Sequence, residues 1–247
     1  MIDQGVIQIA IVAGEPSGDR LGAGLIRELK TILPNARFEG IGGPKMADQG
    51  CQILFHMVRI GVIGLDGLRE KLWDILSIRR RLTALWQRQR PAVFIAVDVP
   101  DFNIALEYRL KQAGIPCVHY VSPTVWAWRS YRIHKIKRSI NHMLALFPFE
   151  AEFYRRHRVP VTCVGHPLAD EISAPDPPAA REALNIGAGL IVALLPGSRR
   201  SEIKRLAPPM IEAARILYSQ YPEIQFILPF ATDSVRETFQ QVVGPVE

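Results

Sequence analysis

Two carboxylates stand directly after a nearly pure apolar run. Asp98 and Asp101 follow Val93–Val97, whose Val, Ile and Phe content predicts a buried strand. In an open parallel sheet, ligands bind beyond the carboxyl ends of the strands. Asp101 precedes Phe102 and is placed to cap the next helix, whereas Asp98 has no such local task. A partly buried carboxylate suits general-base chemistry, so Asp98 is the candidate catalytic base, and a structural role is the alternative.

A glycine-containing loop follows the first apolar run. Residues 13–19 read Ala-Gly-Glu-Pro-Ser-Gly-Asp and lie between a predicted strand and a predicted helix. Glycines permit close backbone approach, and the N–H groups at the start of a helix attract an anion. The spacing matches neither G-x-G-x-x-G nor the Walker loop, so a turn capped by Ser17 or Asp19 is the alternative. The candidate binding residues are Glu15, Ser17, Gly18 and Asp19.

A second loop of this kind, at residues 195–203, precedes another predicted helix. Its glycine and serine can form a backbone nest, and its two arginines offer fork-shaped donors. Arginines at a helix N-terminus oppose the helix dipole, so an anionic ligand explains their position better than stability does. The arrangement suits a diphosphate, and its candidate residues are Gly197, Ser198, Arg199 and Arg200.

Aromatic residues gather after another predicted strand, in the run His119–Arg129. Aromatic rings beside an arginine can stack a sugar or a base, or anchor the protein at a lipid interface. The alternative is a hydrophobic plug under the loop, with His119 as a satisfied core residue. The candidate binding residues are Ser122, Trp126 and Arg129.

The remaining pattern positions these loops in an α/β chain. Short β-branched runs alternate with amphipathic segments of helical length, which indicates a doubly wound parallel sheet with helices on both faces. The expected strands are Ile7–Val12, Arg37–Ile41, Val93–Val97, Cys117–Val121, Met143–Leu146, Val161–Val164, Leu190–Leu195 and Gln225–Leu228. The expected helices are Leu21–Leu33, Leu65–Arg88, Phe102–Ala113, Tyr131–Arg138, Phe149–His157, Ser201–Tyr218 and Asp233–Val242.

A proline-rich stretch divides this pattern. We expect a Rossmann-like domain at residues 1–168, a linker at 169–189, and a second Rossmann-like domain that begins at 190. Residues 190–247 are too few for a complete doubly wound domain with protected sheet edges, so the second domain is expected to be incomplete.

Composition restricts the classes of protein to consider. The 247 residues are 48% hydrophobic and 22% charged, which excludes a disordered chain, and no apolar run approaches a membrane-spanning length. The N-terminal apolar run has no basic region before it and is not typical of a secretory signal. Three widely spaced cysteines without a CxxC pair argue against a disulfide framework and a zinc site, and favour a reducing cytoplasm.

The net charge of +6 is concentrated in two windows. Residues 129–158 carry eight basic and two acidic side chains, and residues 69–90 carry seven and two. Such clusters favour an anionic partner, with a solvated helix face as the alternative. Leu65–Leu85, in the second window, predicts a basic amphipathic helix that either lies at a membrane surface or packs on the sheet.

Several segments become specific when they are taken together and in order. They are GEPSGD (14–19), FEGIGGPKM (38–46), DVPDFN (98–103), HYVSPTVWAWR (119–129), LALFPFE (144–150), VGHPLAD (164–170) and LLPGSRRSEI (194–203). With them the sequence strongly resembles the lipid-A-disaccharide synthase family, from Ile7 to Phe230. Members of that family continue well past the position of Glu247, so the remaining uridine and diphosphate contacts of the second domain have no counterpart here.

The resemblance implies a glycosyltransferase B-type (GT-B) fold and an inverting transfer that uses no metal and no cofactor. The family joins UDP-2,3-diacylglucosamine to 2,3-diacylglucosamine 1-phosphate (lipid X), which gives the β(1→6) lipid A disaccharide 1-phosphate and UDP. Its motifs place the base on Asp98, a diphosphate contact on Arg199, and the GExSGD loop on residues 14–19, close to the cleft.

The resemblance also implies a cellular setting. It predicts a cytoplasmic protein that is peripheral on the inner face of the bacterial inner membrane, with an anionic membrane surface as partner. It leaves open a homo-oligomer of the full-length form.

Three alternatives stay open at this point. One is another UDP-sugar enzyme of the same fold, similar to UDP-GlcNAc 2-epimerase. The others are non-catalytic modules that bind a lipid surface or a nucleic acid. The chain lacks RRM, KH and zinc-finger signatures, so we expect no nucleic-acid partner.

Overall fold

The structure is a computed structural model that describes residues 5–61, 68–172 and 176–244. The chain divides into two compact units, residues 1–173 and 174–247. The division falls inside the stretch 169–189 for which we expected a linker. That stretch also holds two short helices, α7 (Leu168–Glu171) and α8 (Pro177–Ala183), which the sequence pattern did not predict.

The first unit is built on a seven-stranded sheet in the order β3-β2-β1-β4-β5-β6-β7, and all its strand pairs are parallel. The sheet confirms the predicted doubly wound fold class. Its order reverses between β1 and β4, where open α/β sheets bind their ligands. The strands are β1 (Ile7–Ala13), β2 (Ala36–Gly42), β3 (Cys51–His56), β4 (Val93–Val97), β5 (Cys117–Tyr120), β6 (His142–Ala145) and β7 (Val161–Cys163).

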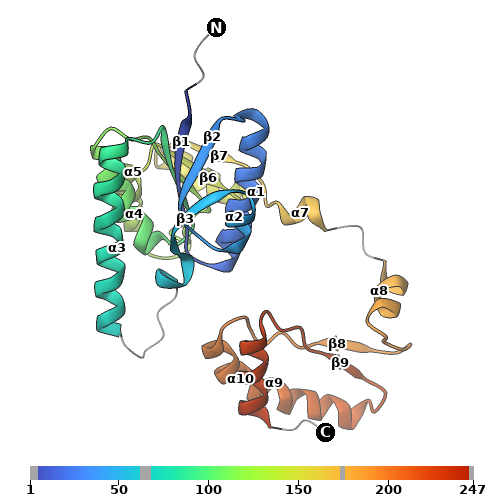
Figure 1. Cartoon of the computed structure of the whole chain (residues 1–247). Coiled ribbons are helices and arrows are strands. Elements are labelled where there is room, and N and C mark those ends of the chain that lie inside the picture. Colours follow the sequence, from blue (N-terminus) through green and yellow to red (C-terminus); the bar gives the residue numbers. More distant parts are fainter. Residues whose placement is uncertain (1–4, 62–67, 173–175, 245–247) are drawn as a thin grey trace. The chain divides into compact units, whose positions relative to one another are not determined.

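Helices cover both faces of this sheet (Figure 1). Alternate residues of β1 point to opposite faces, with Ala10 and Val12 packed in one core cluster and Ile9 and Ile11 in the other. Helices α3 and α4 supply the first cluster, and α1 and α2 the second. The helices of this unit are α1 (Pro16–Ile32), α2 (Pro44–Asp48), α3 (Leu68–Gln89), α4 (Pro100–Gln112), α5 (Ile133–Ser139) and α6 (Pro148–Arg156), with 3₁₀ turns at Met57–Arg59 and Ser130–Arg132.

The sequence left open whether the segment of helix α3 packs on the sheet or lies at a membrane surface. Its apolar stripe packs on the sheet through Ile78, Leu82 and Trp86, which are buried, and the Trp86 indole N–H donates to Glu39 Oε1 at 2.8 Å. Near its N-terminal end, however, Leu72 and Trp73 are exposed. The expected helix start at Leu65 lies outside the described residues.

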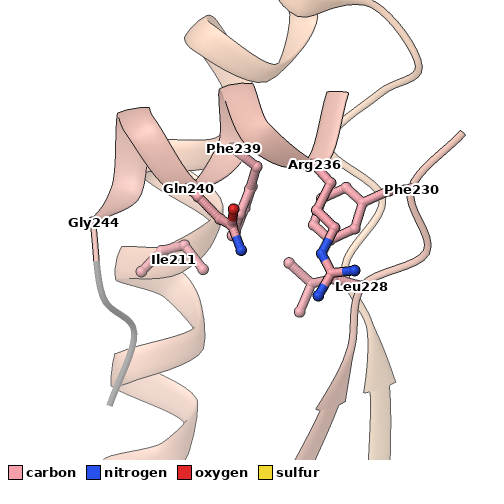
Figure 2. A pocket seen from close by; sticks show the side chains of 7 residues that line it. All are labelled: Ile211, Leu228, Phe230, Arg236, Phe239, Gln240 and Gly244. Atoms are coloured by element: carbon pink, nitrogen blue, oxygen red, sulfur yellow. The ribbon is translucent and has the colours of Figure 1, made fainter. Parts of the chain in front are cut away.

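The second unit is a smaller βαβα arrangement. Strands β8 (Ile191–Ala193) and β9 (Gln225–Ile227) form a parallel pair, and helices α9 (Arg200–Gln220) and α10 (Asp233–Val243) pack together over a small core. Beside this core lies an apolar hollow of 580 Å³, into which Ile211, Leu228 and Phe239 project (Figure 2).

Candidate functional site

The carboxyl ends of β1, β4 and β5 carry three of the predicted loops. Ala13 pairs with Val97 in register, and Val97 pairs with Tyr120, so these strands end side by side. The sheet therefore brings residues 13–19, Asp98 and the aromatic loop to one edge, at its switch point. The fourth predicted loop, at residues 195–203, belongs to the second unit.

Asp98 begins a strained turn. Asp98 has φ of 55° and Val99 has φ of 46°, so two consecutive non-glycine residues adopt the left-handed conformation. A β-branched residue such as Val99 is a genuine outlier there, and such strain is concentrated at functional sites. The backbone of Asp98 is held on both sides, because its N–H donates to Tyr120 O at 2.9 Å and its carbonyl accepts from Asn103 Nδ2 at 2.7 Å. The partly buried carboxylate is thus offered at a fixed position.

Helix α4 starts at Pro100, with Val99 in the N-cap position. The expectation that Asp101 caps this helix is therefore wrong. Asp101 lies in the first turn, where its carboxylate is 83% exposed and pairs with Arg132.

Gly14 makes room for the strained turn. A Cβ at Gly14 would lie 2.7 Å from Val99 Cγ2 and 3.1 Å from the Ile60 side chain. A Cβ at Gly18 would meet Ala13 and Val97 only at ordinary distances of 3.5 Å or more. The first glycine is therefore required by the contact with Val99, whereas the second has space for a methyl group.

These two glycines give a matched pair of predictions. We expect Gly14→Ala to lower the free energy of unfolding of the first unit by about 1–3 kcal/mol, because Val99 cannot move without opening its turn. We expect Gly18→Ala to be neutral or to stabilise by up to about 1 kcal/mol, because alanine favours a helix. Urea unfolding followed by tryptophan fluorescence measures this, since all four tryptophans lie in the first unit. Equal stability of the two variants would contradict the explanation.

In the loop 13–19, Asp19 has a structural role, whereas Ser17 is exposed to solvent. Helix α1 begins at Pro16 with Glu15 in the N-cap position, so the alternative of a turn capped by Ser17 or Asp19 is wrong. Asp19 is 2% exposed, and its carboxylate accepts the N–H groups of Gly43, Lys45 and Met46 at 2.7, 3.0 and 3.2 Å. Asp19 therefore satisfies the free donors at the start of α2. Ser17 is exposed, Glu15 is half-buried, and Gly18 is buried.

Ser17 also borders a hollow of 820 Å³ beside α1. The hollow lies within the first unit, and its polar lining includes Arg20, Lys45, Tyr120, His166 and Asp170.

The aromatic loop is largely exposed. Trp126 is 41% exposed and makes an edge contact with Phe149, whose ring stacks on Phe147 at 5.6 Å. The Arg129 guanidinium lies 4.2 Å from the centroid of the Trp128 ring. A hydrophobic plug does not describe the end of this loop, because Trp126, Ala127 and Trp128 are exposed, although Tyr120, Pro123 and Val125 are buried. Ser122 is buried, and its hydroxyl donates to the Tyr154 hydroxyl oxygen at 3.1 Å.

His119, at the start of this run, is a buried residue with an internal partner. Its Nδ1 lies 2.7 Å from Glu107 Oε1, and both side chains are almost completely buried. Sequence reasoning did not single out Glu107 or Asn103, although both are polar residues on the buried side of α4. Their i, i+4 spacing on an otherwise apolar helix face was the available signal.

In the loop 195–203 of the second unit, backbone N–H groups bind a carboxylate from the same segment. The N–H groups of Ser198 and Arg199 donate to Glu202 Oε2 at 2.9 and 3.0 Å, and these bonds lower the pKa of Glu202. Arg199 Nη1 lies 3.5 Å from Glu202 Oε1, and Arg200 Nε donates to Ser234 Oγ at 2.8 Å. The predicted nest thus accepts a carboxylate, and a diphosphate at the same donors would have to displace it.

Two further findings concern ligands and membranes. Within the described ranges, no three His, Cys, Asp or Glu side chains gather as a metal site. In the same residues, no helix has both the length and the apolar character needed to cross a bilayer.

Comparison with known proteins decides the family. A model of the lipid-A-disaccharide synthetase family matches residues 9–245. The chain belongs to this family. A lipid-A-disaccharide synthase of Hahella chejuensis is 46% identical over 242 residues, which cover 97% of this chain and 61% of the relative. One of Alkalilimnicola ehrlichii is 48% identical over 241 residues, with 96% and 63% covered. The chain therefore spans less than two thirds of the synthases that it matches.

The solved structures agree with a Rossmann-like fold of the GT-B type. A UDP-GlcNAc 2-epimerase from Neisseria meningitidis, bound to UDP-GlcNAc, aligns with a TM-score of 0.58 at 14% identity and covers 97% of this chain and 70% of its own. At this identity the likeness shows the fold alone. The family assignment of the chain to the lipid-A-disaccharide synthases rests on the sequence relatives.

Proposed function

We propose that the chain provides the acceptor side, and the beginning of the nucleotide-sugar side, of an inverting glycosyltransferase of lipid A assembly. In this proposal UDP-2,3-diacylglucosamine is the donor and lipid X is the acceptor. The products are lipid A disaccharide 1-phosphate and UDP. The observation that carries the proposal is the fixed position of Asp98 in a strained turn at the switch point of the sheet, in a chain of this family.

Asp98 would act on the acceptor. Its carboxylate accepts the proton of the 6-hydroxyl, and the electron pair of that oxygen forms the new bond to the anomeric carbon of the donor. The bond from that carbon to the diphosphate breaks on the opposite face, and UDP leaves with the electron pair. Glu15 and Ser17, on the neighbouring strand end, and Trp126 and Arg129 are candidate contacts to the acceptor.

The departing diphosphate needs cationic or N–H donors. The loop 195–203 has both, since Ser198 and Arg199 present backbone N–H groups and Arg199 and Arg200 carry guanidinium groups. These N–H groups bind the Glu202 carboxylate, which supports their ability to bind an oxyanion.

Diacylated substrates require an apolar surface at a membrane. We place this surface at the N-terminal end of α3 and the adjacent 3₁₀ turn, where Val58, Leu72 and Trp73 are exposed. Arginines on α3 would contact anionic headgroups, so the proposal includes peripheral attachment to the cytoplasmic face of the inner membrane.

The proposal is tested by a transfer assay with two donors. Because the chain spans less than two thirds of its relatives, it is assayed alone and as a fusion to the part of the Hahella chejuensis synthase beyond the matched residues. We expect the fusion to form disaccharide and UDP from UDP-2,3-diacylglucosamine and lipid X in mixed vesicles, and to leave UDP-GlcNAc unchanged. Epimerisation of UDP-GlcNAc, or no transfer by either form, would overturn the proposal.

A further inference from the structure

A buried polar cluster on α4 and β5 contacts the Asp98 peptide through Asn103. Asn103 and Glu107 come from α4 and His119 comes from β5, and their exposed fractions are 0%, 0% and 1%. Three of their atoms, Asn103 Oδ1, Glu107 Oε2 and His119 Nε2, have no hydrogen-bond partner in the part of the chain that the structure describes. Unpartnered buried polar atoms cost folding free energy, and each one in a native protein calls for an explanation. Stability alone would favour apolar side chains at these positions.

The geometry connects this cluster to Asp98 through the backbone. Asn103 Nδ2 donates to the Asp98 carbonyl at 2.7 Å, so it stabilises the left-handed conformation in which that carboxylate is presented. Ala96 pairs in register with His119, and the Asp98 N–H continues the same ladder to Tyr120 O. The imidazole thus lies on the strand adjacent to the one that carries Asp98.

The charges of Glu107 and Asp98 both act on His119. Burial opposes a positive charge on His119, but the Glu107 charge, its hydrogen bond and the Asp98 charge together outweigh burial and raise the pKa of His119. Burial raises the pKa of the nearby Cys117 thiol and of the Tyr154 hydroxyl to about 12, so both groups are neutral near pH 7. The Glu107 carboxyl and the His119 imidazole are therefore a buried acid–base pair, and Asp98 is close enough for its charge to raise the pKa of His119.

We propose that Asn103, Glu107 and His119 form a positioning network for Asp98. Glu107 orients the His119 imidazole through Nδ1, the charges of Glu107 and Asp98 both favour the positive form of that ring, and Asn103 fixes the Asp98 peptide. The role of Asp98 as base rests on the proposed function, whereas its coupling to His119 is a property of this chain.

The test measures that coupling without any activity. The full chain is labelled with ¹⁵N-histidine, and the His119 ring signals are assigned among the six histidines by comparison with His119→Gln. The titration of His119 is then followed in the parent, in Asp98→Asn and in Asp101→Asn. Asp101 is the matched control, because it is three residues away, exposed, and paired with Arg132.

We expect Asp98→Asn to lower the pKa of His119 measurably and Asp101→Asn to leave it unchanged. Glu107→Gln should lower it further, since it removes both the charge and the ionic hydrogen bond. An unchanged His119 titration in Asp98→Asn would overturn the network, whether or not Glu107→Gln folds.

A second measurement links the network to turnover. In the fusion, Glu107→Gln is expected to lower kcat at least about tenfold with KM within about twofold, because substrate contacts remain while the base loses its support. Transfer that is unaffected in Glu107→Gln would overturn the positioning role. Absence of transfer in the parent, together with an intact His119–Asp98 coupling, would overturn the proposed function and leave the network standing.

Discussion

Replacing Asp98 by asparagine is expected to lower transfer by the fusion by about 10²–10⁴-fold, the usual contribution of a general base. The asparagine amide cannot accept the proton of the acceptor hydroxyl, although it has nearly the same shape as the carboxylate. The fold should survive, because the bonds that hold residue 98 come from its backbone N–H and carbonyl. Asparagine also tolerates the φ of 55° observed there. The measurement is kcat at saturating donor and acceptor, with fluorescence-detected unfolding as the check on folding.

The control for this prediction is Asp101→Asn. Asp101 lies three residues further on, in the first turn of α4, but its carboxylate is exposed and bound to Arg132. We expect kcat of this variant to stay within about twofold of the parent, because an exposed ion pair contributes little. Asp98→Ala is a less suitable variant, since alanine is strained in the left-handed conformation and would mix a backbone effect with the loss of the base. Parent-like turnover in Asp98→Asn would remove Asp98 as the base.

The sheet could be predicted from sequence because its central strands are buried on both faces. Strands such as Val93–Val97 read as continuous apolar runs, which are typical of a covered parallel sheet. The edge strand β3 was missed because its residues from Gln52 to His56 are exposed or only partly buried and two of them are polar, whereas the valine-rich run of the other edge strand, β7, was predicted. Helix α2 was missed because it has five residues and begins after two glycines. In both cases tertiary pairing, which the local pattern does not contain, forms the element.

A site residue could be predicted only where its place in the sequence already implies its place in the fold. Asp98 follows a buried strand, so its place at the edge of the sheet is implied by the sequence. The role of Asp19 is not, because its three donors belong to a segment 24 to 27 residues further along the chain. Glu107 and His119 meet only when α4 packs on β5, and their pairing depends on that packing.

The loop at residues 195–203 shows a different kind of limit. Its glycine, serine and arginines predicted an anion site, and the N–H groups do bind a carboxylate. That carboxylate comes from Glu202, which the sequence pattern marks only as part of the helix start. A residue three positions into a helix can reach back to the free N–H groups, so an internal anion and an external one compete for the same donors.

Gly40→Ala is expected to destabilise the first unit more than the same methyl group does at Gly14. Gly40 lies in β2 with φ of 153°, at the register shift between β2 and β3, and pairs with Ile11 of the central strand β1. A Cβ at this position would stand 1.8 Å from the Ile11 carbonyl oxygen. The position of this Cβ is fixed by the backbone of residue 40, and the Ile11 oxygen also belongs to the backbone, so no side-chain rotation relieves the overlap. The ladder between β1 and β2 would have to open.

We expect the substitution to lower the free energy of unfolding of the first unit by about 4 kcal/mol or more, the range in which a single change is exceptional. Tryptophan fluorescence in urea measures it. Gly24→Ala is the matched control, because the same methyl group on α1 meets nothing within 4 Å and should stabilise the helix slightly. Since β1 carries the loop 13–19 and pairs with the strand before Asp98, Gly40→Ala should also abolish transfer by the fusion. A Gly40→Ala chain as stable as Gly24→Ala would contradict the predicted overlap with the Ile11 carbonyl oxygen.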